Sequence, residues 1–218
     1  MFFTRSVYLP VLGISLLSLG TSAVPVMAQS TVNIKTDYDF STSVTFLENN
    51  LAQGIGEGVT NNAPFGLNRF NNTIFSRSSE LLSSLQTGRE FAVNSDPQAL
   101  GLLGKAGGVT FFGKNNDKLF GTLNGVNTIN PQTSVISLLV NINITGGEGR
   151  FSNATGTGAF SGTVALDPTQ PVSRGILGLN LSVTTPKSVP ELNNISSLVA
   201  AALSVGFFIK KSPRYLQK

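Results

Sequence analysis

Residues 32–46 alternate between apolar and polar side chains, and this alternation constrains the fold more than any other feature of the sequence. The apolar set is Val32, Ile34, Tyr38, Phe40, Val44 and Phe46, and the polar set is Asn33, Lys35, Asp37, Asp39, Ser41 and Ser43. Successive side chains of a β-strand point to opposite faces, so the pattern predicts a strand with one buried and one solvated face. The run is long for one strand, and we expect a bend or hairpin near Ser41–Ser43.

Seven further segments have the composition of strands: residues 54–60, 67–76, 109–113, 118–129, 135–145, 156–166 and 176–184. Turn-forming residues separate many of them, at 61–64, 115–117, 130–131, 146–147 and 167–168. The long connection 78–104 contains Leu81, Leu82 and Leu85, which predict a short helix. The sequence therefore predicts an all-β domain over residues 29–188, as a single antiparallel barrel of about eight strands or, alternatively, a two-sheet β-sandwich.

Residues 1–28 have the three parts of a secretory signal peptide. Arg5 gives a positive start, residues 7–19 form an apolar helix, and small residues ending at Ala28 form a cleavage site. We expect signal peptidase to cleave after Ala28. An uncleaved membrane anchor is the alternative, although the apolar run is shorter than the ~20 residues that a membrane span needs.

Residues 189–218 also have three parts. These are the motif Val189-Pro190-Glu191, an apolar segment from Ile195 to Ile209, and a basic end with Lys210, Lys211 and Arg214. Basic residues after an apolar helix remain on the cytoplasmic side of a membrane, so this order predicts a membrane helix over 195–209 with residues 29–188 outside. A plain C-terminal anchor and a core helix of the domain are the alternatives.

This three-part tail resembles the PEP-CTERM sorting signal of exported bacterial proteins, in which a Pro-Glu-Pro motif precedes an apolar helix and an arginine-rich end. The present motif reads Val189-Pro190-Glu191-Leu192, without the second proline. The resemblance implies that an exosortase-type membrane protease cuts near the motif. It also implies release or transfer of the domain to the cell surface, often in organisms that make exopolysaccharide.

The segment 144–156 contains a Gly146-Gly147 turn, then Gly149-Arg150-Phe151, then an Ala-x-Gly sequence. It resembles the corresponding part of the allene oxide cyclase and dirigent group, which are eight-stranded antiparallel barrels around an apolar cavity. Independently of that resemblance, the three glycines permit positive φ, and we expect Phe151 to point inward.

The sequence contains no histidine and no cysteine, which excludes Ser-His-Asp and Cys-His nucleophilic systems and ordinary structural zinc sites. We predict no metal, no cofactor and no catalytic residue, and therefore a protein that is not an enzyme. The net charge of +4 comes from the two ends, because residues 29–188 hold ten basic and ten acidic residues. A neutral domain gives no support for nucleic-acid binding.

Three residues are candidates for a ligand site: Tyr38, Glu148 and Arg150. If Tyr38 points into a barrel, its hydroxyl can serve a ligand, although a core tyrosine with a hydrogen-bonded tip is the commoner case. Arg150 follows a glycine-rich turn, where it can meet an acidic sugar or form a surface ion pair with Glu148. Asp37 with Asp39, and the turn 115–117, are better explained by solvation and by turn formation than by catalysis or Ca²⁺ binding.

Two functions remain open. The first is a non-catalytic, exported cell-surface or extracellular-matrix protein that acts by adhesion or binding, with exopolysaccharide as a candidate partner. It would be anchored in the membrane, or free at the surface after processing of the tail. The second is a barrel that binds a small apolar ligand or guides its cyclisation. A cavity of several hundred Å³ would favour the second function, and a solid core would exclude it.

Overall fold

The computed structural model describes residues 28–167 and 170–187. Within these residues the strands are β1 (Ala28–Phe46), β2 (Leu51–Val59), β3 (Arg69–Arg77), β4 (Phe91–Asn94), β5 (Gly108–Phe112), β6 (Lys118–Asn130), β7 (Val135–Glu148), β8 (Thr155–Ala165) and β9 (Ser173–Lys187). The connections contain helix α1 (Ser78–Thr87) and four short 3-10 turns: η1 (Pro64–Gly66), η2 (Pro97–Leu100), η3 (Lys114–Asn116) and η4 (Gly149–Phe151).

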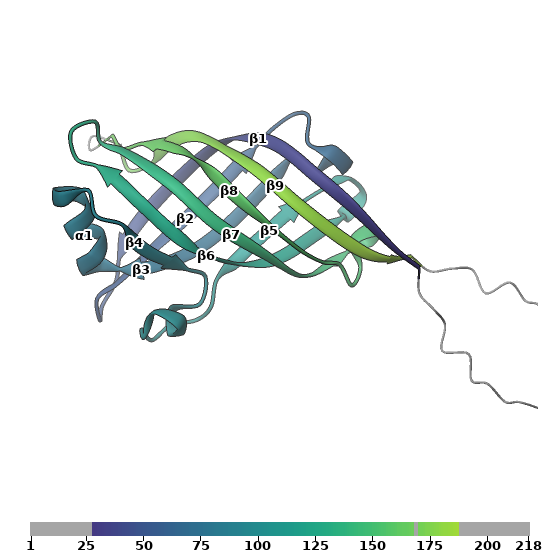
Figure 1. Ribbon diagram of the computed structural model, residues 1–218, viewed down its shortest axis with the longest axis horizontal. Coiled ribbons are helices and arrows are strands. Elements are labelled where there is room, and N and C mark those ends of the chain that lie inside the picture. The colour runs from purple at the N-terminus through teal and green to yellow at the C-terminus, as the bar shows by residue number, and fades with distance from the viewer. Residues whose placement is uncertain (1–27, 168–169, 188–218) are drawn as a thin grey trace, which may run out of the picture.

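The nine strands form one antiparallel sheet that closes into a ring (Figure 1). Around the ring the order is β1, β9, β8, β7, β6, β5, β3 and β2, and β2 pairs again with β1. The short strands β4 and β5 lie one after the other between β3 and β6, because each pairs with both of them. The prediction of an antiparallel all-β fold is confirmed, and a single closed sheet replaces the alternative of two packed sheets.

Strand β1 is continuous through Ser41–Ser43, so the predicted bend or hairpin there is wrong. The chain turns later, at residues 47–50, where Asn49 and Asn50 adopt positive φ. β1 is long because its first part pairs with β9 and its last part with β2. The Thr42 hydroxyl donates to the Ile55 carbonyl of β2 at 3.0 Å, which helps to hold this part of β1 in the sheet.

The predicted turn at Gly146-Gly147 is also wrong, because β7 continues to Glu148 and the reversal follows at η4. Only Gly149 of the three glycines has positive φ, at 65°. Gly147 is instead a point of close approach, since a Cβ there would overlap the backbone of Phe151 and Lys118. Phe151 is 2% exposed, which confirms its predicted inward direction.

The strands alternate inward and outward side chains, and the inward face of β2 is formed by Ala52, Gly54, Gly56 and Gly58. A Cβ on Gly58 would overlap the ring of Phe70, and a Cβ on Gly56 would overlap the ring of Phe40 and the amide of Asn72. The missing side chains of β2 therefore provide the space that these neighbouring side chains occupy.

The closed sheet has two ends, which we call the helix end and the terminal end (Figure 1). The helix end contains α1, the β1–β2 turn, the turn 131–134 and the β8–β9 loop. The terminal end contains the start of β1, the end of β9, and the connections at η1, η3 and η4. The interior of the sheet differs between these two ends, as the side chains described below show.

Most of the sorting predictions lie outside the described residues. The signal segment is outside except for Ala28, whose backbone begins β1, and the motif, apolar segment and basic end of the tail are all outside. Within the described part of the chain, no helix is long and apolar enough to cross a membrane.

Candidate functional site

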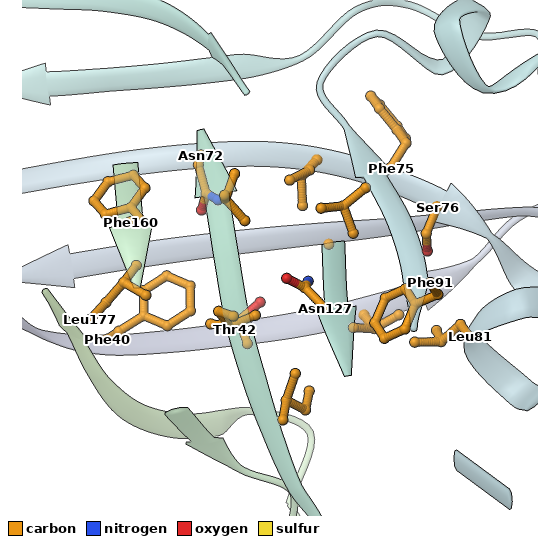
Figure 2. A pocket seen from close by; sticks show the side chains of 17 residues that line it. Phe40, Thr42, Asn72, Phe75, Ser76, Leu81, Phe91, Asn127, Phe160 and Leu177 are labelled. Carbon is orange, nitrogen blue, oxygen red and sulfur yellow. The ribbon is translucent and has the colours of Figure 1, made fainter. Parts of the chain in front are cut away.

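A cavity of about 80 Å³ lies inside the closed sheet at its helix end. The residues that line it come from β1 to β4, from β6 to β9 and from α1: Phe40, Thr42, Val44, Gly54, Asn72, Ile74, Phe75, Ser76, Leu81, Phe91, Val93, Asn127, Ile136, Leu138, Val140, Phe160 and Leu177. Of these lining residues only Val44 is exposed, at 44%. Figure 2 shows the apolar side chains around two amides. The lining contains no ionisable side chain.

Asn127 is the most unusual residue of the cavity. It stands on the inward face of β6, in line with Leu123 and Ile129, and is 7% exposed. Its Oδ1 is buried and accepts no hydrogen bond from any residue that the structure describes. Buried amides in proteins nearly always have such partners, so an amide without one at a core position is exceptional.

Asn72 supplies a second buried amide from β3. It lies between the inward-facing Phe70 and Ile74 and opposite Gly56 of β2. Its Oδ1 is also buried and accepts no hydrogen bond from the described residues. In Figure 2 the amides of Asn72 and Asn127 both lie among the cavity residues. The hydroxyl of Thr42 donates its hydrogen to the Ile55 carbonyl and therefore does not donate to either amide oxygen.

An unpaired acceptor in an apolar interior costs about 1–3 kcal/mol of folding free energy. Two amide oxygens of this kind therefore lower the stability of the fold unless another molecule supplies hydrogen-bond donors. A ligand hydroxyl or N–H group in the cavity could donate the hydrogen bonds that these amide oxygens lack. The arrangement can bind and orient a neutral molecule, and the lining contains no ionisable side chain for proton transfer.

An aromatic cluster fills the interior toward the terminal end. Phe70 is central to it, with ring centroids 4.8 Å from Tyr38, 4.8 Å from Phe160 and 5.8 Å from Phe111. Tyr38, Phe70 and Phe111 are each 0% exposed. Phe160 belongs to both regions, because it packs on Phe70 and also lines the cavity.

The structure places Tyr38 in this cluster and not in the cavity lining. Its hydroxyl donates to the Leu67 carbonyl at 2.6 Å. Burial raises the pKa of the Tyr38 hydroxyl well above its ordinary value, because the ionised form would lose its hydration. Tyr38 is therefore a core residue with a hydrogen-bonded hydroxyl, which was the commoner of the two interpretations.

Arg150 and Glu148 lie at the terminal end, and they are not paired with each other. Arg150 donates from Nε to Asp117 Oδ2 at 2.6 Å, and its backbone N–H donates to Asp117 Oδ1 at 2.9 Å. Glu148 instead pairs with Lys118 at 2.7 Å. The reason is Gly149, whose positive φ reverses the chain between the two residues and brings it against Asp117. The predicted Arg150–Glu148 pair is therefore wrong.

The structure thus does not bring Tyr38, Glu148 and Arg150 together, and the residues that do form a site were missed. Asparagine is common in this sequence, so Asn72 and Asn127 did not stand out. Their position was the available signal, because each stands where the alternation of its strand requires a buried side chain. Elsewhere in the described ranges, no three His, Cys, Asp or Glu side chains gather where they could hold a metal ion.

No protein-family model and no curated protein matches the sequence. Among solved structures, the chain is similar to a pterocarpan synthase dirigent protein, with 14% sequence identity and a TM-score of 0.26. The match covers 75% of this chain and 89% of that one. The dirigent group is also one of the two that segment 144–156 resembles, but values this low support no inference about function.

Proposed function

We propose that the protein binds a small, neutral, mainly apolar molecule in the cavity at the helix end. The observation that supports this proposal best is the buried amide of Asn127, whose oxygen has no partner in a mainly apolar lining. The ligand would donate a hydrogen bond to this oxygen, and a second donor would serve Asn72. Guiding a cyclisation would require, in addition, that the inserted end hold the rest of a longer ligand in one folded conformation.

The size of the cavity limits the ligand. The interior is not solid, yet its free volume of about 80 Å³ is far below the ~300–1,000 Å³ of pockets that enclose drug-sized molecules. The ligand is therefore either very small or a longer molecule that inserts one end past Val44. Since the lining offers no charge to pair with, an ionised group would be held without compensation, and a neutral inserted group is required.

Two probes of nearly equal shape test the proposal: phenol, which has a hydroxyl donor, and toluene, which has a methyl group in its place. We expect phenol to bind the full chain about tenfold more tightly than toluene, as measured by ligand-observed NMR titration. In Asn127→Leu the preference should disappear. Asn141→Leu, the same change on the outer face of β7, should retain it. Equal affinity of phenol and toluene for the unaltered protein would overturn the proposal.

A second function is favoured by the outer face of the sheet. Along one register row the outward residues of β6, β7, β8, β9 and β1 are Thr122, Asn143, Thr157, Ser182 and Asn33. This uncharged row of hydroxyls and amides is suited to contact with a polyhydroxylated polymer. We therefore also propose that the protein acts by contact with polysaccharide. The signal-like residues 1–28 and the three-part tail 189–218 support the further proposal that it is exported to the cell surface.

Intact mass spectrometry of the native protein tests the export proposal. Membrane and extracellular fractions of the producing cells should be measured separately. We expect a species that lacks residues 1–28 and ends near Val189–Leu192. A species that retains Met1, or a membrane-bound one that retains Lys218, would contradict signal cleavage or tail processing, respectively.

A further inference from the structure

A groove on the outside of the sheet combines an amide row with an apolar row. It lies over β4, β6 and β7, which are adjacent in the sheet, and of its lining residues only Val93 also lines the internal cavity. Its lining is formed by Ala92, Val93, Asn94, Leu100, Asn124, Gly125, Val126, Leu139 and Asn141. No member of this lining is ionisable.

The amide row crosses three strands in register. Asn94 is opposite Asn124, and Asn124 is opposite Asn141. Asn124 and Asn141 are exposed, and their amides make no hydrogen bond to the described residues. Asn94 accepts from the Asp96 backbone N–H at 2.8 Å, which leaves its NH₂ group as a donor. Each free amide offers both donors and an acceptor, at the 4.7–4.9 Å spacing of neighbouring strands.

The apolar row lies beside the amide row. Ala92 is opposite Val126, and Val126 is opposite Leu139. Val126 is 39% exposed and Leu139 is 56% exposed, on a sheet whose neighbouring outward positions are mostly polar. Exposed aliphatic side chains that adjoin a row of free amides give the groove two chemically different sides.

We infer that this outer groove binds an uncharged oligosaccharide or polysaccharide chain. A sugar ring has hydroxyls at its edge and C–H groups on its faces, so its edge would meet the amide row and one face would lie on Val126 and Leu139. The neutral lining argues against a charged chain. A peptide that adds as a strand is excluded along this part of β6, because β4 and β7 already pair with both of its edges. The inference gives a site to the proposed contact with polysaccharide and rests on that function.

The experiment measures binding of the purified full chain to an array of immobilised neutral and acidic oligosaccharides. Leu139→Asp tests the groove, because it places a charge on the apolar row. Ile55→Asp is the matched control, since Ile55 is a 50% exposed aliphatic residue on the outer face of β2, outside the groove. We expect the unaltered protein and the control to bind neutral chains alike, and Leu139→Asp to lose at least tenfold in affinity.

The outcomes separate the site from the function. If the unaltered protein binds no oligosaccharide, the proposed polysaccharide contact fails and the groove fails with it. If it binds neutral chains and both aspartate variants bind equally well, the function stands and the groove is the wrong site. Circular dichroism of the two variants ensures that a loss reflects the groove, and Asn124→Ala with Asn141→Ala tests the amide row if Leu139→Asp does not fold.

Discussion

The two halves of the closed sheet are filled in different ways. Toward the terminal end, aromatic rings pack against one another and the Tyr38 hydroxyl has a partner in the Leu67 carbonyl. Toward the helix end, two amide oxygens are buried without partners around a cavity of about 80 Å³. Most strands run through both halves, with β4 only in the cavity half and β5 only in the aromatic half. The difference therefore arises largely from which inward positions hold aromatic side chains and which hold asparagine.

This difference separates stability from binding. A packed aromatic half supplies dispersion and hydrophobic free energy, and its buried tyrosine hydroxyl is paired. The cavity half gives up part of that free energy, through empty space and through unpaired acceptors. A fold can tolerate the second half because the first is well packed. Substitutions in the two halves should therefore have effects of different size and, at Asn127, of different sign.

The largest effect is expected from Phe70→Ala. Phe70 contacts four other rings and is fully buried, so its removal should lower the free energy of unfolding by about 3–5 kcal/mol. Urea denaturation followed by tyrosine fluorescence or circular dichroism measures this change. The same substitution at Phe91, which borders the cavity, should cost less because one side of that ring already faces free space. Equal losses at both positions would mean that the halves are packed alike.

The next effect is expected from Asp117→Ala at the terminal end. Asp117 is 4% exposed and accepts two hydrogen bonds from Arg150, one of them from the guanidinium. We expect a loss of about 2 kcal/mol in unfolding free energy, because these bonds involve charged groups. Glu148→Ala is the control: its pair with Lys118 is largely solvated and should contribute less than about 1 kcal/mol. Phenol binding at the helix end should be unchanged in both variants.

Tyr38→Phe tests the pairing of polar atoms in the aromatic half. The substitution retains the ring but leaves the buried Leu67 carbonyl without the hydroxyl, which should lower the free energy of unfolding by about 1–2 kcal/mol at neutral pH. Thermal denaturation at pH 7 measures the loss. An unchanged melting temperature would show that the hydroxyl contributes nothing to this half.

The same variant has a pH signature. The pKa of Tyr38 is raised in the folded protein, so above about pH 10 the unfolded chain releases this proton while the folded protein retains it. The stabilisation is thus complete below pH 10 and is lost as the pH rises above that value. Urea midpoints from pH 8 to pH 11 should fall more steeply for the unaltered protein than for Tyr38→Phe, and parallel curves would contradict the burial of this hydroxyl.

Most of the sheet could be predicted from the sequence because alternation is a local property. All seven later strand segments overlap observed strands, and the helix around Leu81 is α1. The short strand β4 was missed because its four residues alone show no usable period. The position of β1's turn was missed as well, since the length of β1 depends on its pairing with both β9 and β2.

The site could be predicted less well because it depends on contacts between distant strands. The sequence suggested an acidic sugar or the neighbouring Glu148 as partners of Arg150. Its partner in the structure, Asp117, is 33 residues away and is brought close by the pairing of β6 with β7. The asparagines of the cavity come from β3 and β6, and sequence alone does not show that both face the same free space. Alternation identifies an inward amide, but only the closed sheet shows whether it has a partner.

The smallest predicted effect is a gain in stability. Asn127→Leu replaces an amide whose buried oxygen is unpaired with an apolar side chain of similar size, in a lining that is mainly apolar. Removing the unpaired acceptor should raise the free energy of unfolding by about 1 kcal/mol in the absence of ligand, as measured by urea denaturation. Asn141→Leu, on the solvated outer face, should change it by less than about 0.5 kcal/mol. A loss of stability in Asn127→Leu would show that this amide is satisfied within the fold, and the helix half would then be a structural core like the other half. A gain, together with loss of the preference for phenol over toluene, would show that the protein keeps Asn127 for binding at the expense of its stability.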